Sequence, residues 1–260
     1  MNLRRHIYKV VILVWLLGLS AAIAAPSDGL KAANQLYDSG KFAEAVVAYE
    51  KIEPKTAHVY YNLGNAWFRQ NKLGLAILNY AQASRLAPRD PDILANLKFA
   101  QQRLGVDEVN TPPRAMQRFL RSVIESCTAS EWSAGELVGL WLLALAIGAC
   151  VYLPKARTAF QVIAVAGFVV FGFSTFALSY QVISDHIAPQ AIVVAGETEA
   201  HFAPVPDSTI HFRLAEGTQV AIREDRGQWL FVERADRQQG WVKSEALGRI
   251  TNFRRSLTGS

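Results

Sequence analysis

Cysteine and histidine are the side chains of this sequence best suited to nucleophilic or metal chemistry, and they are scattered. Of the five histidines, only His201 and His211 stand where they could meet across neighbouring strands. No cysteine and no paired carboxylates accompany them, so they do not form a convincing zinc site. The Walker loop, GxSxG, HExxH and CxxC motifs are all missing from the sequence. We therefore expect a non-enzymatic protein with no catalytic residue, no metal and no cofactor. A redox enzyme of the envelope that uses Cys127 is the alternative.

Repeated aromatic and small residues between positions 26 and 105 indicate binding instead. Residues 57–90 span 34 positions and match the tetratricopeptide pattern, in which small residues let two antiparallel helices approach closely. The matching residues are Tyr60, Leu63, Gly64, Trp67, Ala76, Tyr80, Ala83 and Pro88. A weaker copy lies 31 residues earlier, and its second helix must end early, near Pro54. Asp90-Pro91 then begins a capping helix. We expect an all-α tetratricopeptide repeat domain of five helices over residues 26–105, with a plain helical bundle as the alternative.

The first helix of each repeat is expected to face a concave groove that binds a peptide or partner segment. At the ninth consensus place, Asn34 and Asn65 carry carboxamides that both donate to and accept from a peptide backbone. Aromatic and basic neighbours complete the candidate groove, which consists of Asn34, Tyr37, His58, Tyr61, Asn65, Phe68 and Arg69. The asparagines resemble the pair of peptide-clamping tetratricopeptide domains. The fifth place differs, because Leu30, Tyr61 and Ala95 replace the lysines that hold a C-terminal carboxylate. The alternative is that both asparagines are solvated or bond within the chain.

Three apolar segments indicate export and membrane insertion. Residues 1–24 have the basic start, apolar run and small-residue cleavage site of a signal peptide, with an uncleaved anchor as the alternative. Residues 133–153 predict a first transmembrane helix that begins at a capping box of Ser133 and Glu136. Residues 158–182 predict a second one. The alternative is a buried helical hairpin of a soluble protein.

The short segment between the two predicted spans sets the topology. Residues 154–157 hold two cations and no acid, which places this loop in the cytoplasm by the positive-inside rule. Both soluble domains of this multi-pass protein then lie in the periplasm, outside the bacterial inner (cytoplasmic) membrane. On this topology Cys127 and Cys150 lie toward opposite ends of the first span, so we expect no disulfide between them.

Residues 106–132 predict a linker and a juxtamembrane helix. Asn110-Thr-Pro-Pro reads as the linker. Within residues 114–124, apolar side chains recur at helical spacing among arginines, at Met116, Phe119, Leu120, Val123 and Ile124. This pattern fits a helix on the outer surface of the bilayer with its arginines at the headgroups, and a plain connecting helix fits nearly as well.

Residues 188–250 predict a small all-β barrel, followed by a tail over residues 251–260. Short β-branched runs separated by turns predict five strands, at 191–195, 209–214, 219–223, 229–233 and 240–243. The Glu216-Gly217-Thr218 turn, Gly227-x-Trp229 and Gly240-Trp241-Val242 resemble a bacterial SH3 domain. We expect Trp229 and Trp241 to fill or edge the core. Binding of cell-wall peptide or glycan stays open.

The order of these segments resembles the BatE family of aerotolerance-operon proteins. The resemblance rests on the signal, the repeat with Tyr61-Asn-Leu-Gly-Asn-Ala66, the 90–97 segment, the two spans with their small basic loop, and the SH3-like barrel. It implies a non-enzymatic inner-membrane component that works with von Willebrand A-domain membrane proteins and a MoxR-type AAA+ ATPase. It also implies a link to oxidative-stress or envelope-stress tolerance. The fold class is thus a multi-domain membrane protein with a tetratricopeptide domain, a two-helix transmembrane hairpin and an SH3-like barrel.

Two functions of different classes follow. In the first, the protein is a scaffold whose groove around Asn34, Asn65 and Phe68 holds an exported partner segment. In the second, it is a membrane-anchored cell-wall sensor whose barrel binds peptidoglycan. Nucleic acid is not an expected partner, although the net charge is +5. The cationic surplus lies in the first nine residues and around the 154–157 loop, and the charges elsewhere nearly balance.

Overall fold

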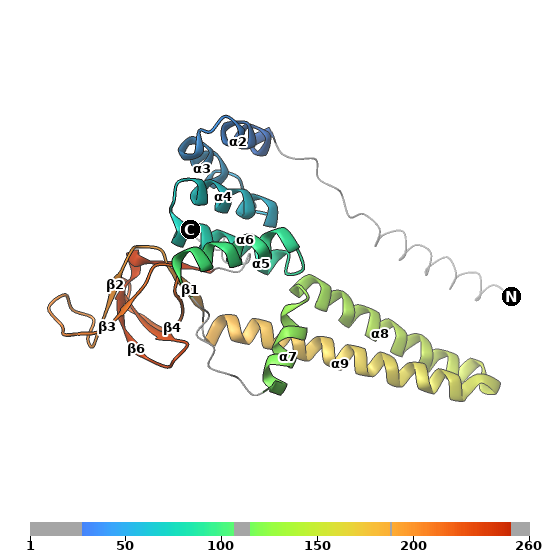
Figure 1. Cartoon of the computed structure of the whole chain (residues 1–260). Coiled ribbons are helices and arrows are strands. Elements are labelled where there is room, and N and C mark those ends of the chain that lie inside the picture. Colours follow the sequence, from blue (N-terminus) through green and yellow to red (C-terminus); the bar gives the residue numbers. More distant parts are fainter. Residues whose placement is uncertain (1–27, 107–114, 188, 251–260) are drawn as a thin grey trace.

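The structure, a computed structural model, describes residues 28–106, 115–187 and 189–250 (Figure 1). A helical N-terminal region is followed by a hairpin of two long apolar helices and by a C-terminal antiparallel sheet. This confirms the predicted mixture of helical, apolar-helical and sheet regions. The predicted signal peptide (1–24) and tail (251–260) lie outside the described residues.

Five helices form the N-terminal region within residues 28–106, as predicted. They are α2 (Asp28–Asp38), α3 (Phe42–Glu50), α4 (Ala57–Arg69), α5 (Leu73–Leu86) and α6 (Pro91–Leu104). Each helix packs against the next one in the chain. The early end of α3 at Glu50 confirms that this hairpin is shorter than the next. The N-cap of α6 is also confirmed, because the Asp90 side chain accepts the backbone N–H of Asp92 at 3.0 Å and of Ile93 at 3.3 Å.

Small residues let α4 and α5 approach closely. A Cβ atom on Gly64 would lie only 2.7 Å from the ring of Tyr80, so this glycine makes room for the tyrosine. Ala66 and Ala76 are completely buried in the same region. Tyr49 and Tyr80, at 1% and 2% exposure, are the largest fully buried side chains among the described residues, and each brings its hydroxyl group into the helical core.

Two apolar helices follow, α8 (Ala129–Tyr152) and α9 (Arg157–Ile187), joined by the 3-10 turn η1 (Pro154–Ala156). Both are long and apolar enough to cross a membrane. They pack against each other along their length, and the shorter α7 (Ala115–Glu125) crosses them at the end nearer the sheet (Figure 1). Their outward-facing apolar side chains are exposed; for example, Leu145 is 60% and Val165 is 63% exposed. A buried hairpin of a soluble protein would not expose so much apolar surface.

The capping box of α8 lies five residues earlier than the sequence suggests. Glu131 donates its backbone N–H to Oγ1 of Thr128 at 3.3 Å, and the Thr128 backbone N–H donates to Oε2 of Glu131 at 2.8 Å. The predicted capping box of Ser133 and Glu136 is therefore wrong. Ser133 lies inside the helix, where its hydroxyl donates to the Ala129 carbonyl at 2.9 Å.

Glycines let α8 and α9 meet at the backbone. A Cβ atom on Gly139 would lie 2.6 Å from the backbone nitrogen of Phe171, and one on Gly167 would lie 2.9 Å from that of Leu143. Close approach at small residues is how helices associate where no hydrophobic effect drives them together.

Seven strands form one antiparallel sheet within residues 189–250. They are β1 (Gln190–Val193), β2 (Thr198–His201), β3 (Ile210–Leu214), β4 (Gln219–Asp225), β5 (Trp229–Arg234), β6 (Gln239–Lys243) and β7 (Leu247–Arg249), in the order β3-β2-β6-β5-β4-β1-β7. The five predicted strands are present, and β2 and β7 are additional. All seven strands contribute to one buried core, so the sheet curls over itself (Figure 1). Trp229 and Trp241 are buried at 8% and 7% exposure, as expected.

The helical region packs directly against the outside of this sheet, although the hairpin separates them in sequence. Along β1 the side chains alternate, so Ala191 and Val193 enter the sheet core while Ile192 faces away. Ile192 and Ile250 instead join a buried cluster with Ile77 of α5. This contact was not predicted, because β1 reads from sequence as an ordinary strand with one internal face.

Two hydrogen bonds fix the same contact. The backbone N–H of Gly74, at the start of α5, donates to Oε1 of Glu216 at 2.6 Å. Gln82 donates from Nε2 to the carbonyl of Arg249 at 3.2 Å. Glu216 thus supplies α5 with an acceptor for one of the free N–H groups of its first turn.

Candidate functional site

Four asparagines on three helices of the helical region form two hydrogen-bonded pairs, Asn34 of α2 with Asn62 of α4 and Asn65 of α4 with Asn96 of α6, and we call the four the asparagine row. Oδ1 of Asn34 accepts from Asn62 Nδ2 at 3.1 Å and from the Tyr49 hydroxyl at 2.7 Å. One repeat later, Oδ1 of Asn65 accepts from Asn96 Nδ2 at 3.2 Å and from the Tyr80 hydroxyl at 2.7 Å. The same arrangement therefore occurs twice.

These bonds decide what the row offers to a ligand. The oxygens of Asn34 and Asn65 each accept two hydrogen bonds already, which uses their acceptor capacity. Among the described residues, the structure shows no acceptor for the Nδ2 groups of these two asparagines. Both residues are only partly buried, so their N–H groups remain for solvent or for the carbonyl groups of a bound chain.

The tyrosine hydroxyls in this network stay protonated at neutral pH. Burial raises the pKa of Tyr49 to about 12, and the nearby carboxylate of Asp38 adds to the shift. Burial also raises the pKa of Tyr80 above its ordinary value, with a smaller contribution from Tyr61. Both hydroxyls therefore act as donors, and the asparagine oxygens act as their acceptors.

His58 and Tyr61, two of the predicted groove residues, each contact an asparagine of the row. Asn96 donates from Nδ2 to the Tyr61 hydroxyl at 3.0 Å, and the Tyr61 ring lies 6.0 Å from that of Tyr80. Nε2 of His58 lies 3.3 Å from Asn62 Nδ2. The structure thus places Asn34 and His58 in one network, through Asn62, and Asn65 and Tyr61 in a second one, through Asn96.

Tyr37, Phe68 and Arg69 belong to two aromatic clusters instead of the row itself. In the first, Tyr37 packs edge-on to Phe42 at 5.3 Å, and the Arg69 guanidinium lies 4.6 Å from the centre of the Phe42 ring. In the second, Phe68 lies 5.7 Å from Phe99, with the Arg103 guanidinium 5.3 Å from the Phe68 ring. Each cluster presents an arginine over an aromatic ring.

Sequence reasoning missed several members of these networks. The sequence indicates Asn62 and Asn96 only through a repeated Asn-Leu pair, Asn62-Leu63 and Asn96-Leu97. Tyr49 and Tyr80 occur at equivalent places of the two repeats, and their position predicts core packing but not the hydroxyl bond. The second arginine, Arg103, lies after the last match to the repeat pattern, so nothing in the pattern marked it.

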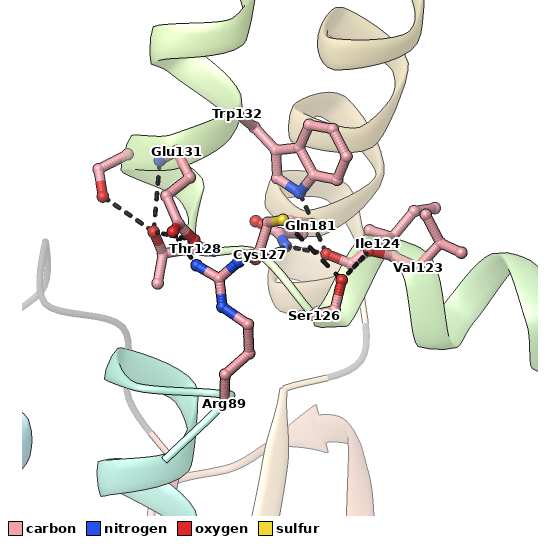
Figure 2. A network of polar contacts seen from close by, with 10 residues as sticks. Arg89, Val123, Ile124, Ser126, Cys127, Thr128, Glu131, Trp132 and Gln181 are labelled. Carbon is pink, nitrogen blue, oxygen red and sulfur yellow. Dashed lines mark hydrogen bonds and ion pairs between the residues drawn. The ribbon is translucent and has the colours of Figure 1, made fainter.

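A second polar network joins the helical region to the hairpin. Arg89, in the loop after α5, forms an ion pair with Glu131, which is also bonded to Thr128 at the start of α8 (Figure 2). A hollow of about 430 Å³ lies between this loop and the first turn of α8. Both charged groups are exposed, so salt will screen their attraction.

The two cysteines are free and lie near opposite ends of α8. Sγ of Cys127 is 3.8 Å from the Ser126 hydroxyl, and Sγ of Cys150 is 3.7 Å from the carbonyl of Arg157. Along a helix, the distance from Cys127 to Cys150 would be about 35 Å, which is several times the Cα separation of a disulfide. This geometry agrees with the expectation that the two do not pair within one chain.

The two histidines of the sheet have separate surroundings. Nδ1 of His201 lies 2.8 Å from the Ser208 carbonyl, and its ring packs edge-on to Trp229 at 5.4 Å. His211 stacks on Phe202 at 4.2 Å, and its Nδ1 lies 3.0 Å from the Gln239 carbonyl. No group of three histidine, cysteine or carboxylate side chains suited to a metal ion occurs in residues 28–106, 115–187 and 189–250.

A cleft of about 620 Å³ opens beside His201 on the sheet. Its charged lining has both signs, with carboxylates from Glu197, Glu199 and Glu245 and cations from Arg213 and Lys243. Arg213 lies 3.6 Å from Glu197 and 3.5 Å from Glu199, and Lys243 lies 4.0 Å from Glu245. These separations are long for ion pairs, so the groups are only loosely paired.

Comparison with known proteins adds no family to these observations. No protein-family model matches the chain, and no match occurs among curated proteins.

Proposed function

We propose that this chain is a non-enzymatic scaffold of the bacterial inner membrane that binds a protein partner across the asparagine row. In this proposal the helical region is a short tetratricopeptide array, the sheet is a bacterial SH3-like domain, and the hairpin is a transmembrane anchor. The proposed setting is a BatE-like complex for aerotolerance and oxidative-stress tolerance. Its proposed partners are membrane proteins with von Willebrand A domains and, through them, a MoxR-type AAA+ ATPase.

The repeated asparagine row is the observation that carries the proposal. Its side chains are held in place by buried tyrosine hydroxyls, so little conformational freedom is lost when a partner binds. The remaining Nδ2 donors of Asn34 and Asn65 are suited to backbone carbonyls of an extended chain. The two arginine-capped aromatic clusters beside the row add apolar area and positive charge.

The packing of α5 on β1 and β7 supports the proposed topology. A hairpin that crosses the membrane twice returns the chain to the side it started from, and the contact requires both soluble regions on one side. The turn between α8 and α9 carries exposed Lys155 and Arg157, as the cytoplasmic end of such a hairpin should. The periplasm is therefore the proposed location of both soluble regions.

The test is co-purification from crosslinked membranes. Alanine at Asn34 or Asn65 would disturb the tyrosine network, so the informative variant is the double change Arg69→Ala and Arg103→Ala at the exposed clusters. The matched control is Lys72→Ala with Lys98→Ala, which removes the same charge from exposed positions of the same region.

The native chain and the control should capture a membrane protein with a von Willebrand A domain, and the arginine variant should lose it at equal abundance. Equal capture by all three chains would show that the arginines of the two aromatic clusters do not bind the partner. Capture of other proteins alone would contradict the BatE-like setting.

The alternative function, a cell-wall sensor, is favoured by the mixed-charge cleft of the sheet. A cleft with both signs suits a ligand that itself carries amino and carboxylate groups, such as a wall peptide. The full chain in detergent should then sediment with purified sacculi in a saturable way, and Arg213→Ala should weaken it. The scaffold proposal expects no saturable binding.

A further inference from the structure

Helix α7 is attached to one end of the hairpin by its last turn. Trp132 of α8 donates from Nε1 to the Ile124 carbonyl at 3.1 Å, and Gln181 of α9 donates from Nε2 to the same carbonyl at 2.8 Å. Gln181 also reaches the Cys127 carbonyl at 3.0 Å, and the Ile124 side chain is only 2% exposed (Figure 2). Both long helices thus hold the free carbonyl end of α7, which satisfies acceptors that a helix end leaves open.

This attachment lies where the apolar part of the hairpin begins. In α8, Trp132 precedes the uncharged run from Leu137 by five residues, or about 7.5 Å along the helix axis. In α9, Gln181 lies close to the end of the run at Ser184. Tyr180, the residue before Gln181, is 41% exposed. Tryptophan and tyrosine, the types of Trp132 and Tyr180, are enriched where the hydrocarbon of a membrane meets the lipid headgroups.

An apolar part of α7 is left uncovered by the described residues. Phe119 is 62% exposed and Leu120 is 38% exposed. Leu120 precedes the buried Ile124 by four residues, so the two share one face of the helix. The opposite face carries the exposed Glu125, whereas the exposed Ser122 lies three residues from Phe119, at the edge of the apolar face. The exposed apolar face is therefore continuous with the part of α7 that touches the hairpin.

We propose that α7 lies along the outer boundary of the bilayer, with Phe119 and Leu120 in contact with lipid. This inference rests on the proposed membrane crossing of α8 and α9. If the hairpin crosses, its long axis runs along the bilayer normal, and α7, which crosses the hairpin, runs along the surface (Figure 1). We expect lipid to cover the exposed apolar face of α7, because the lipid around the hairpin would extend to the level of Trp132 and Gln181, where α7 is attached.

Helix α7 then sets how deep the hairpin lies in the membrane. The hairpin passes through the bilayer, while α7 resists movement of the chain in the direction of the normal. The loop that holds Arg89 contacts the first turn of α8 through Glu131, so the same depth sets the height of the helical region above the lipid.

The experiment measures depth with nitroxide labels on the full chain in vesicles of phosphatidylcholine and phosphatidylglycerol. Cys127→Ser and Cys150→Ser provide the background, and single cysteines are introduced by Phe119→Cys, Glu125→Cys or Leu145→Cys. Dissolved oxygen reports contact with hydrocarbon, and a water-soluble nickel chelate reports contact with water. Glu125→Cys is the matched control on the polar face of α7, and Leu145→Cys reports whether the hairpin spans.

The proposal expects labels at 119 and 145 to favour oxygen and the label at 125 to favour nickel. Nickel contact at 119 with oxygen contact at 145 overturns the position of α7 but leaves the hairpin in the membrane. Nickel contact at 145 overturns both. A label at 119 that neither reagent reaches means that protein, not lipid, covers the face, which also overturns the proposal. If Phe119→Cys does not insert, Leu120→Cys tests the same face.

Discussion

The Tyr80 hydroxyl donates to Oδ1 of Asn65 at 2.7 Å, so that a buried side chain of α5 holds a side chain on the face of α4. The pair Tyr49 and Asn34 repeats this contact, also at 2.7 Å, between α3 and α2. A second carboxamide then donates to the same oxygen from the next first helix. The oxygens of Asn34 and Asn65 therefore each accept one bond from within their own hairpin and one from the next helix along the chain. The asparagine row is thus a structural feature as well as a candidate binding surface.

Removing one hydroxyl should destabilise the helical region measurably. Tyr80→Phe keeps the ring but deletes the donor to Asn65, and we expect a loss of about 1 kcal/mol in the free energy of unfolding. The measurement is denaturant unfolding of the full chain in detergent, followed by circular dichroism. Tyr60→Phe is the control, because no hydroxyl partner for Tyr60 is found among the described residues. Equal loss in both variants would mean that the hydroxyl bond does not matter.

The raised pKa values of the tyrosines predict an alkaline limit to stability. The pKa of Tyr49 is about 12 in the folded chain, above its ordinary value of 10.0, because burial disfavours the charged form. The contribution of protonated, buried Tyr49 to the free energy of unfolding is fully present below pH 10 and is lost as the pH rises toward and through 12. Absorbance of tyrosinate should therefore show late ionisation in the native chain, and one late step should disappear in Tyr49→Phe. Ionisation of all tyrosines near their ordinary pKa would contradict the buried network.

The contact between the helical region and the sheet should be sensitive to one added methyl group. A Cβ atom on Gly248 would lie 2.3 Å from Cδ2 of Leu78, so Gly248→Ala forces this side chain to move. We expect the free energy of unfolding to fall by about 1–3 kcal/mol and proteases to cleave the chain faster, because the two regions separate more easily. Gly196→Ala is the matched control, because no atom lies within 4 Å of its added Cβ. Unchanged proteolysis in Gly248→Ala would show that the two regions do not depend on this contact.

Local sequence patterns predicted most of the elements, because each depends on neighbouring residues. Asp90-Pro91 predicts the start of α6 from capping alone, and alternating apolar residues predict β4 to β6. The two missed strands are short, and β2 contains Glu199 and His201, which conceal its alternation. The start of α8 was misplaced because Thr128-x-x-Glu131 and Ser133-x-x-Glu136 both fit a capping box.

Contacts between distant parts of the chain could not be predicted in this way. Ile192 and Ile250 have the same residue type as core positions, and only the folded sheet shows that they face α5. The groove residues were partly predictable, because repeat position places Asn34 and Asn65 on the first helices. Their bonds to Tyr49 and Tyr80 depend on the distance between helices, which the pattern does not contain.

The packing of α8 against α9 should be disrupted when a methyl group is added at Gly139, where the two backbones approach closely. In Gly139→Ala the new Cβ would lie 2.6 Å from the backbone nitrogen of Phe171, which cannot move without shifting α9. Gly148→Ala is the control within the same helix, because nothing lies within 4 Å of its Cβ. In a helix, alanine is more stable than glycine by about 0.8–1 kcal/mol, so the control should keep or raise the unfolding temperature in detergent.

The readout for this comparison is the fluorescence of Trp132, whose ring packs edge-on to Phe173 of α9 at 5.5 Å. Because the sequence has six tryptophans, this emission is the difference between each chain and the same chain with Trp132→Phe. Separation of the helices should expose this ring and shift its emission in Gly139→Ala but not in Gly148→Ala. Because Trp132 also donates to the Ile124 carbonyl, the same separation should release α7 from the hairpin. Unchanged emission in Gly139→Ala would mean that the hairpin tolerates a wider crossing and that the glycine contact does not hold the two helices together.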